Sequence, residues 1–450
     1  MKKIFQYIML AVVTIVMASC TSDIEETTAT TGKNNVQLVV GEFPAFGDSQ
    51  TRAIGTPDEG KTSWAVGDEL LLVIDNTFYG KQYATFTYNG KSWELTSGEL
   101  VYREGDPAYI PHVYYAPNYK WEAGKLILKE GKVAGTDEYI EGNARITGNG
   151  ETITVSFAEA TRKYSRLRIA TLPNEQITVD TEYFTPAGSS DMEQNGNYTL
   201  TSDEKGNAYL YGTFDNNSIV TVKYRGASLA THKFSKRTEN AKSYALDATV
   251  ISANSAEEIK SAIEQKVADG KTTIRLNLAP NAGTDEFMAI REAIKGAAPN
   301  DEGTIELTII GVETIPEEAF KRMSQLKSVK MPDVKEIKKY AFSECQYLTV
   351  VEAPSLNKLY SGAFNECYLL SKLTFGPINY ADARYWSIFE DITPNIDLIL
   401  SDYQKEMIET DDDLYTANND IDYAFSPEHV SKNFLGHEFK SITCRRYRVE

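Results

Sequence analysis

The feature that most constrains this chain is a segment that repeats every 22 residues. The dipeptide Ala341-Phe342 recurs as Ala319-Phe320 and as Ala363-Phe364, and apolar residues recur in register on both sides of it. The other aligned columns between residues 312 and 377 are Val312, Val334, Leu356; Ile315, Ile337, Leu359; Met323, Cys345, Cys367; Leu326, Leu348, Leu370; and Val329, Val351, Leu373. Columns in register over three copies predict a coil in which each copy forms one turn and its apolar residues stack inward on the neighbouring turns.

The spacing of these columns resembles the BspA-type leucine-rich repeat, which is common on surface proteins of oral and gut bacteria. The resemblance implies an α/β leucine-rich-repeat solenoid with a parallel sheet, which we assign to residues 249–450. Less regular units flank the clean repeats, and exposed apolar ends of a solenoid must be covered. The predicted flanking elements are helices at 255–270 and 284–297 and strands at 273–279, 305–309, 396–400 and 440–447.

Alternate residues of each repeat strand face outward on one side of the parallel sheet. Solenoids often bind ligands on such a face. Plain solvation of these polar side chains is the alternative, and the sequence favours neither. The predicted ligand face consists of Ser328, Lys330, Val350, Glu352, Lys372 and Thr374.

Two of the four cysteines belong to the repeat. Cys345 and Cys367 share their column with Met323, so the position accepts a small or flexible apolar group. Catalysis and metal binding both require a fixed ligand type, and this column does not have one. A disulfide between the two cysteines is left open, because adjacent turns about 4.8 Å apart are compatible with the spacing of bridged cysteines.

The first half of the chain contains short alternating segments separated by turn residues such as Asn89-Gly90. Period-two alternation with Gly, Asn, Asp or Pro in the gaps predicts antiparallel β-sandwiches. The predicted strands are 36–40, 69–74, 83–88, 125–129, 152–157, 166–170 and 219–224.

Several motifs in this half resemble the fimbrillin-like family of Bacteroidetes surface proteins. They are Thr51-Arg52, the run from Trp64 to Asp68, residues 86–93 and the run Val113-Tyr-Tyr-Ala-Pro117. The resemblance implies an all-β fold of two transthyretin-like sandwiches, here at 36–159 and 160–248, and a role as pilus subunit or tip adhesin. Pilins of the family are cut after a basic residue beyond the first strand, which makes Arg52 a possible processing site. A solvated loop arginine is the simpler interpretation of that residue.

The N-terminus resembles a bacterial lipoprotein signal. Lys2 and Lys3 precede an apolar run that is too short to span a bilayer. Met17-Ala18-Ser19-Cys20 resembles a lipobox, and the acidic residues after it resemble the export tag of Bacteroidetes lipoproteins. The resemblance implies a signal peptide at 1–19, lipidation of Cys20 and a surface-exposed lipoprotein of the outer membrane. Residues 20–35 are polar and poor in apolar groups, which predicts a flexible tether.

The net charge and the missing motifs argue against several classes of function. The formal net charge of −18 disfavours a nucleic acid partner. The sequence lacks GxSxG, P-loop and HExxH motifs, and its four histidines (His112, His232, His429 and His437) have no metal-ligand spacing. The acidic run at 411–422 could supply calcium ligands, but it lacks the EF-hand glycine and glutamate, so a solvated loop is favoured. We therefore predict no enzyme, no cofactor and no metal site.

Two functions fit these observations. In the first, a lipid-anchored adhesin presents the solenoid face to a protein or glycan on host or neighbouring cells. In the second, the fimbrillin-like domains assemble the chain with other pilus subunits as a fimbrial tip or accessory subunit. About 200 residues follow the second predicted sandwich, and we expect them to obstruct elongation of a pilus shaft.

Overall fold

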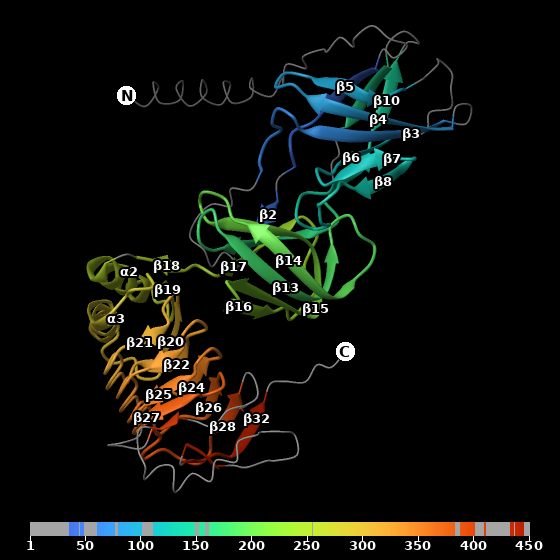
Figure 1. The fold of residues 1–450 in the computed structure, drawn as a ribbon. Coiled ribbons are helices and arrows are strands. Elements are labelled where there is room, and N and C mark those ends of the chain that lie inside the picture. The colour runs from blue at the N-terminus through green and yellow to red at the C-terminus, as the bar shows by residue number, and fades with distance from the viewer. Residues whose placement is uncertain are drawn as a thin grey trace, which may run out of the picture.

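The structure is a computed structural model, and it describes most of the chain between residues 36 and 444. The described ranges are 36–44, 46–48, 61–76, 80–100, 111–148, 153–157, 162–253, 255–382, 388–400, 409–410, 433–435 and 437–444. Strands dominate these ranges, and they form several separate sheets (Figure 1). No helix within the described ranges is long and apolar enough to cross a membrane.

Two sheets near the N-terminus pack around one core. The five-stranded sheet has the order β5-β4-β3-β6-β9, and the three-stranded sheet has the order β1-β11-β10. Leu38 and Val155 from the smaller sheet lie in the same buried cluster as Leu72, Phe86 and Trp93 from the larger one. The strands are β1 (Val36–Val40), β3 (Glu69–Asn76), β4 (Gly80–Tyr88), β5 (Trp93–Gly98), β6 (His112–Tyr115), β9 (Ile140–Asn143), β10 (Arg145–Gly148) and β11 (Ile153–Phe157), with a hairpin of β7 (Tyr119–Glu122) and β8 (Lys125–Leu128) beside them.

The next sheet has seven strands and encloses its own core, which includes Val179, Phe214 and Val222. Its 18-residue strand β15 makes this possible, because the first half of β15 pairs with β12 and the second half pairs with β16. One edge strand, β2, comes from the N-terminal segment and pairs in parallel with β17. The strands are β2 (Gly47–Asp48), β12 (Ser165–Ala170), β13 (Gln176–Pro186), β14 (Glu193–Thr201), β15 (Asn207–Tyr224), β16 (Ala227–Lys233) and β17 (Lys242–Asp247).

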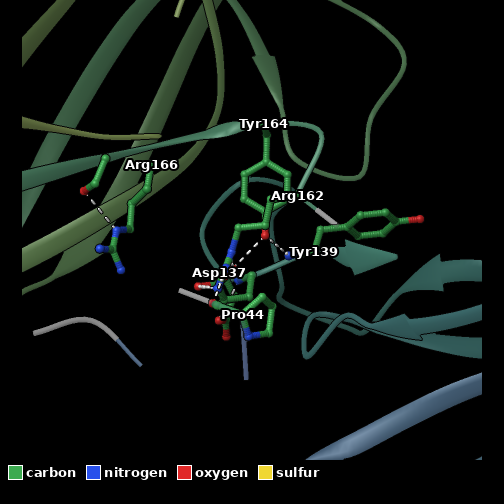
Figure 2. A network of polar contacts seen from close by, with 8 residues as sticks. Pro44, Asp137, Tyr139, Arg162, Tyr164 and Arg166 are labelled. Carbon is green, nitrogen blue, oxygen red and sulfur yellow. Dashed lines mark hydrogen bonds and ion pairs between the residues drawn. The ribbon is translucent and has the colours of Figure 1, made fainter. Parts of the chain in front are cut away.

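A buried ion pair joins these two β regions (Figure 2). The Arg162 guanidinium donates from Nε and Nη2 to the two carboxylate oxygens of Glu138, at 3.0 and 3.1 Å. The Tyr164 hydroxyl donates to the same carboxylate at 2.6 Å, and Arg162 Nη1 donates to the Pro44 carbonyl. Phe46 packs against the Arg162 guanidinium, whose centre lies 3.9 Å from the ring centroid. The segment that leads from β1 to β2 is therefore fixed at the start of the second sheet.

Two helices and two parallel sheets make up the solenoid. Helix α2 (Ala256–Ala268) begins at Ser255, whose Oγ accepts from Glu258 N, and helix α3 (Thr284–Ala297) follows it. The larger sheet has the order β18-β19-β20-β22-β24-β26-β28-β32 and the smaller one has β21-β23-β25-β27-β29, with every neighbouring pair parallel. The strands of the larger sheet are β18 (Ile251–Ser252), β19 (Thr273–Asn277), β20 (Ile305–Ile310), β22 (Leu326–Lys330), β24 (Val350–Ala353), β26 (Lys372–Phe375), β28 (Asp397–Leu400) and β32 (Ser441–Cys444). Those of the smaller sheet are β21 (Thr314–Ile315), β23 (Glu336–Ile337), β25 (Lys358–Tyr360), β27 (Tyr380–Asp382) and β29 (Glu409–Thr410), and a short pair, β30 (Asn433–Phe434) and β31 (His437–Glu438), lies near the end.

The repeat columns stack as the 22-residue register predicts. Val329 pairs with Val351, and Val351 with Leu373, and all three side chains are buried. Between the sheets, Phe320 N donates to Ala341 O and Phe342 N donates to Ala363 O, so backbone hydrogen bonds link successive turns there too. The inward columns form one continuous core that extends from Ile259 of α2 to Ile442 of β32.

The strands predicted from period-two alternation are all present, within two or three residues at most ends, except that β15 is far longer than predicted. The helix predicted at 284–297 has those bounds in the structure, and the flanking strands of the solenoid also form. Trp93 and Tyr115 are buried in the first core, and Trp64 packs against both rings. Cys20 and Arg52 lie outside the described residues.

Candidate ligand-binding face

The outward residues of the larger solenoid sheet form two continuous rows. Inward Val, Leu and Ile side chains alternate with them, so the packing of the core holds the outward positions in register. The first row is Thr273, Glu306, Ser328, Val350, Lys372, Asp397 and Ser441. The second row is Arg275, Thr308, Lys330, Glu352, Thr374, Ile399 and Thr443.

All six residues of the predicted ligand face belong to these rows. Ser328 pairs with Val350, which pairs with Lys372, and Lys330 pairs with Glu352, which pairs with Thr374. The rows also continue onto the flanking strands in both directions, beyond the six residues that the sequence predicted for the face. Five of the six side chains are half-buried, and Thr374 is buried.

Opposite charges face each other along the rows and reduce the net charge of the face. Lys330 Nζ lies 3.7 Å from Glu352 Oε2 within the second row, and Nζ of Lys327, which precedes Ser328 in the chain, lies 2.9 Å from Oε1 of Glu306 in the first row. At the C-terminal end, the Ser441 hydroxyl donates to Asp397 Oδ1 at 2.6 Å, and this bond lowers the pKa of that carboxyl group. A polar surface of this kind can offer hydrogen-bond donors and acceptors at fixed spacings, which suits recognition better than chemistry.

The seven-stranded sheet covers the N-terminal end of the two rows. Strand β16 of that sheet lies beside the start of the solenoid (Figure 1), and Arg275 Nε donates to the Leu229 carbonyl of β16 at 2.5 Å. Ile310, at the end of β20, is buried in the core of the seven-stranded sheet. The outward face is therefore partly an intramolecular interface at this end. A charged residue, Arg275, within the apolar strand 273–279 was the one sequence signal of that contact.

A pocket of about 340 Å³ remains where the two surfaces meet. Ser328 and Lys330 of the predicted ligand face line it from the solenoid, together with outward residues of β19 and β20. The opposite wall is the stretch from Ser228 to Thr231 of β16. Sequence reasoning missed this pocket because its two walls lie far apart in the chain.

The two repeat cysteines are buried free thiols. Cys345 Sγ donates to the Phe320 carbonyl at 3.0 Å, and Cys367 Sγ donates to the Phe342 carbonyl at 3.1 Å. Burial raises the pKa of Cys345 to about 12 and also raises the pKa of Cys367. The disulfide that the sequence left open is therefore not formed, and a protonated buried thiol is a poor nucleophile or metal ligand.

The described residues contain no group of three or more His, Cys, Asp and Glu side chains that could hold a metal ion. His112 contacts Asn143 and Glu141 in the first β region, and His437 packs against Phe389 and Phe439 at the end of the solenoid. His429 and the acidic run 411–422 lie outside the described residues.

Two solved structures resemble part of the chain at low sequence identity. A candidate cell adhesion protein from Bacteroides fragilis is 10% identical, with a TM-score of 0.28, over 48% of this chain and 93% of that one. The minor pilin GBS52 of Streptococcus agalactiae is 8% identical, with a TM-score of 0.18, over 48% of this chain and 94% of that one. These scores are too low to assign a fold or a function.

No curated protein matches the chain at a significant level. Residues 304–401 match the family model "BspA type Leucine rich repeat region" in six copies. The match extends the clean repeats of 312–377 in both directions, in agreement with the two rows of the larger sheet. The chain thus contains a BspA-type leucine-rich repeat region at residues 304–401.

Proposed function

We propose that this protein is a surface-anchored, non-catalytic adhesin that binds a protein or glycan through the outward rows of its solenoid. The observation that carries the proposal is the continuity of these rows across seven parallel strands, from Thr273 and Arg275 to Ser441 and Thr443. A stacked core behind the rows keeps their spacing fixed. A rigid face loses little conformational freedom when it binds, which favours affinity.

The anchoring part of the proposal rests on the sequence. The lipobox resemblance at Met17–Cys20 supports removal of residues 1–19, lipidation of Cys20, and attachment to the outer membrane through the tether at 20–35. We further propose β domains at 36–159 and 160–248 and a repeat domain at 249–450. In this arrangement the β domains act as a stalk that holds the solenoid away from the membrane.

Charge reversal within the open part of the face tests the proposed function. Lys372→Glu and Glu352→Lys change the outward rows, and Lys358→Glu changes an exposed lysine of β25 in the other sheet. Binding of the purified chain to immobilised matrix proteins and to a glycan array should fall about tenfold for the first two variants and stay unchanged for the third. Equal effects of all three variants, or no binding by the unmodified chain to either kind of surface, would contradict the proposal.

The alternative is a fimbrial tip or accessory subunit. It is favoured by the N-terminal segment, which supplies edge strand β1 to the first β region and edge strand β2 to the second. A cut at Arg52 would separate this segment from the rest of the chain. Polymer ladders on size-exclusion chromatography after limited trypsin treatment would support assembly and count against a stand-alone adhesin.

A further inference from the structure

The pocket between β16 and the solenoid has the size of a small-molecule site. Its volume of about 340 Å³ falls in the range of roughly 300–1,000 Å³ that ligand pockets usually occupy. One wall is formed by Ser228–Thr231 of β16 with Leu246 and Asp247 of β17, and the other is formed by residues of β19, β20 and β22. Because both walls belong to packed sheets, the pocket is formed before any ligand arrives.

Arg275 is the buried charged group of this pocket. Its side chain is 8% exposed, and its Nε–H donates to the Leu229 carbonyl at 2.5 Å. A guanidinium has five N–H donors. Among the described residues, the remaining contact is an ion pair in which Nη1 lies 3.9 Å from Asp247 Oδ1. The other N–H groups are not sealed off from the pocket, and an oxygen-rich ligand there would accept hydrogen bonds from them.

A buried threonine lies next to Arg275. Thr308 pairs with Arg275 in the parallel ladder and is 5% exposed. Thr308 lines the pocket, and its hydroxyl is not sealed off from it. Its half-buried neighbours Thr273 and Ser328 line the same wall, so the pocket offers several hydroxyl groups beside the guanidinium.

The charged side chains that line the pocket are two acidic and two basic residues, so they carry no net charge together. Asp247 and Glu306 are acidic, and Arg275 and Lys330 are basic. Burial alone would raise the pKa of Asp247, but hydrogen bonds from Thr249 and the nearby cations outweigh it, so the pKa is lowered and the carboxylate stays charged. A lining with fixed donors, fixed acceptors and no net charge disfavours strongly ionic ligands.

The lining is also poor in apolar side chains. Of its apolar lining residues, Leu229 belongs to the core of the seven-stranded sheet and Leu307 to the core of the solenoid, and Ala230 and Leu246 pack against the first of these cores. An apolar ligand would lose the hydration of these polar walls without compensation.

We propose that this pocket binds a neutral hexose residue at the end of a glycan. Each sugar hydroxyl can donate to Asp247 or Glu306 and accept from Arg275 or Lys330, which matches a wall of alternating charges better than a purely donating or accepting ligand does. The inference rests on the proposed adhesin function and assigns its ligand class and its place on the face.

A pair of matched threonines tests the site. Thr308 of the outward row and Thr181 of β13 are 5% and 2% exposed, but only Thr308 lines the pocket or belongs to the outward rows. Saturation-transfer NMR on the full chain with free glucose, galactose, mannose and N-acetylneuraminic acid would identify the bound sugar class. For the hexose that binds, Thr308→Val should weaken binding about tenfold and Thr181→Val should leave it unchanged. Lys330→Gln against Lys358→Gln provides a second matched pair, because Lys358 lies on β25, outside both the pocket and the outward rows.

Each result has a distinct meaning. Hexose binding that depends on Thr308 and Lys330 but not on Thr181 and Lys358 supports the site. If Lys372→Gln abolishes hexose binding while Thr308→Val keeps it, the face binds ligand but the pocket assignment is wrong. Binding of N-acetylneuraminic acid alone, or of matrix proteins with no sugar binding, overturns the neutral-sugar assignment and leaves the proposed function in place. A chain that binds neither sugars nor proteins contradicts both.

Discussion

Phe342 and Phe364 stack face to face on successive solenoid turns, with ring centroids 5.5 Å apart and ring planes 6° apart. Phe320 continues the stack on one side at 5.2 Å, and Phe389 continues it on the other at 5.9 Å. The column extends through the interior between the two parallel sheets. Each of these four turns therefore contributes one ring to a stack that no turn could bury alone.

We expect loss of one ring to destabilise the solenoid strongly. Phe342→Ala removes the middle of the stack and leaves a cavity, which typically costs about 3–5 kcal/mol for a buried phenylalanine. Hydrogen exchange at the turn-to-turn amides of Phe320 and Phe342 would report the local free energy of opening. Tyr368→Ala, at a site that is 43% exposed, is the control and should change it by less than about 0.5 kcal/mol. Equal protection in the two variants would contradict a supporting role for the ring stack.

The buried pair of Arg162 and Glu138 should behave differently when one or both partners are removed. Both side chains are 1% exposed. Arg162→Met leaves the Glu138 carboxylate buried without its cation, and breaking such a pair typically costs about 3–5 kcal/mol. Arg162→Met combined with Glu138→Leu removes both charges, so we expect it to cost less than Arg162→Met alone. Urea denaturation of the four proteins of this double-mutant cycle measures the coupling, and strictly additive effects would contradict it.

The repeat half was predictable because periodic sequence fixes periodic structure. A column that contains Met323, Cys345 and Cys367 can only be a stacked apolar position, and the structure buries all three. The same register placed Ser328, Val350 and Lys372 side by side on the outward face. In each case one unit of sequence predicts its neighbours, because parallel strands repeat the same alternation from turn to turn.

Contacts between distant segments were not predictable from the sequence. The parallel pairing of β2 with β17 joins residues 47–48 to residues 242–243, and neither segment has a period that points to the other. The ion pair of Arg162 with Glu138 and the bond from Arg275 to Leu229 are single contacts of the same kind. The candidate pocket depends on such contacts, whereas the predicted ligand face depends on the repeat alone.

The two buried thiols should make the solenoid sensitive to alkaline pH. The pKa of Cys345 is about 12 in the folded chain against an ordinary value of 9.0, and burial raises the pKa of Cys367 as well. The unfolded thiols ionise first, so their contribution to stability is complete below pH 9 and is lost as pH rises from 9 toward 12. At pH 10 the loss should reach roughly 1 kcal/mol for Cys345, and Cys367 should add a loss of the same sign.

A serine variant tests this sensitivity. Cys345→Ser with Cys367→Ser retains a donor for the Phe320 and Phe342 carbonyls but does not titrate in this range. Between pH 8 and pH 10, its free energy of unfolding should fall less than that of the unmodified chain. The difference between the two proteins reports the contribution of the thiols alone, because tyrosines and lysines titrate in both proteins alike. Identical pH profiles would show that the thiols are not protonated and buried as the structure indicates.

Gly362 is required by the aromatic ring of the preceding turn. It has a φ of +64°, and a Cβ atom placed there would lie 2.5 Å from the Cδ1 and Cε1 atoms of Tyr340. The equivalent residues of the earlier turns, Glu318 and Tyr340, have the same backbone conformation with side chains, each with φ of 54°. The left-handed backbone alone thus accepts a side chain at a cost of about 1–2 kcal/mol, and the clash with the ring is specific to Gly362.

We therefore expect Gly362→Ala to destabilise the solenoid by more than the left-handed conformation alone would. Adding Tyr340→Ala should remove the clash, so the double variant should be more stable than the sum of the single changes predicts. Gly296→Ala on α3 is the control, since nothing lies within 4 Å of a Cβ atom there. In a helix that substitution should stabilise the chain by about 0.5–1 kcal/mol. Urea denaturation of these variants measures the free energy of unfolding of each one. Purely additive effects of the changes at 340 and 362 would show that the Tyr340 ring is not the reason for a glycine at 362.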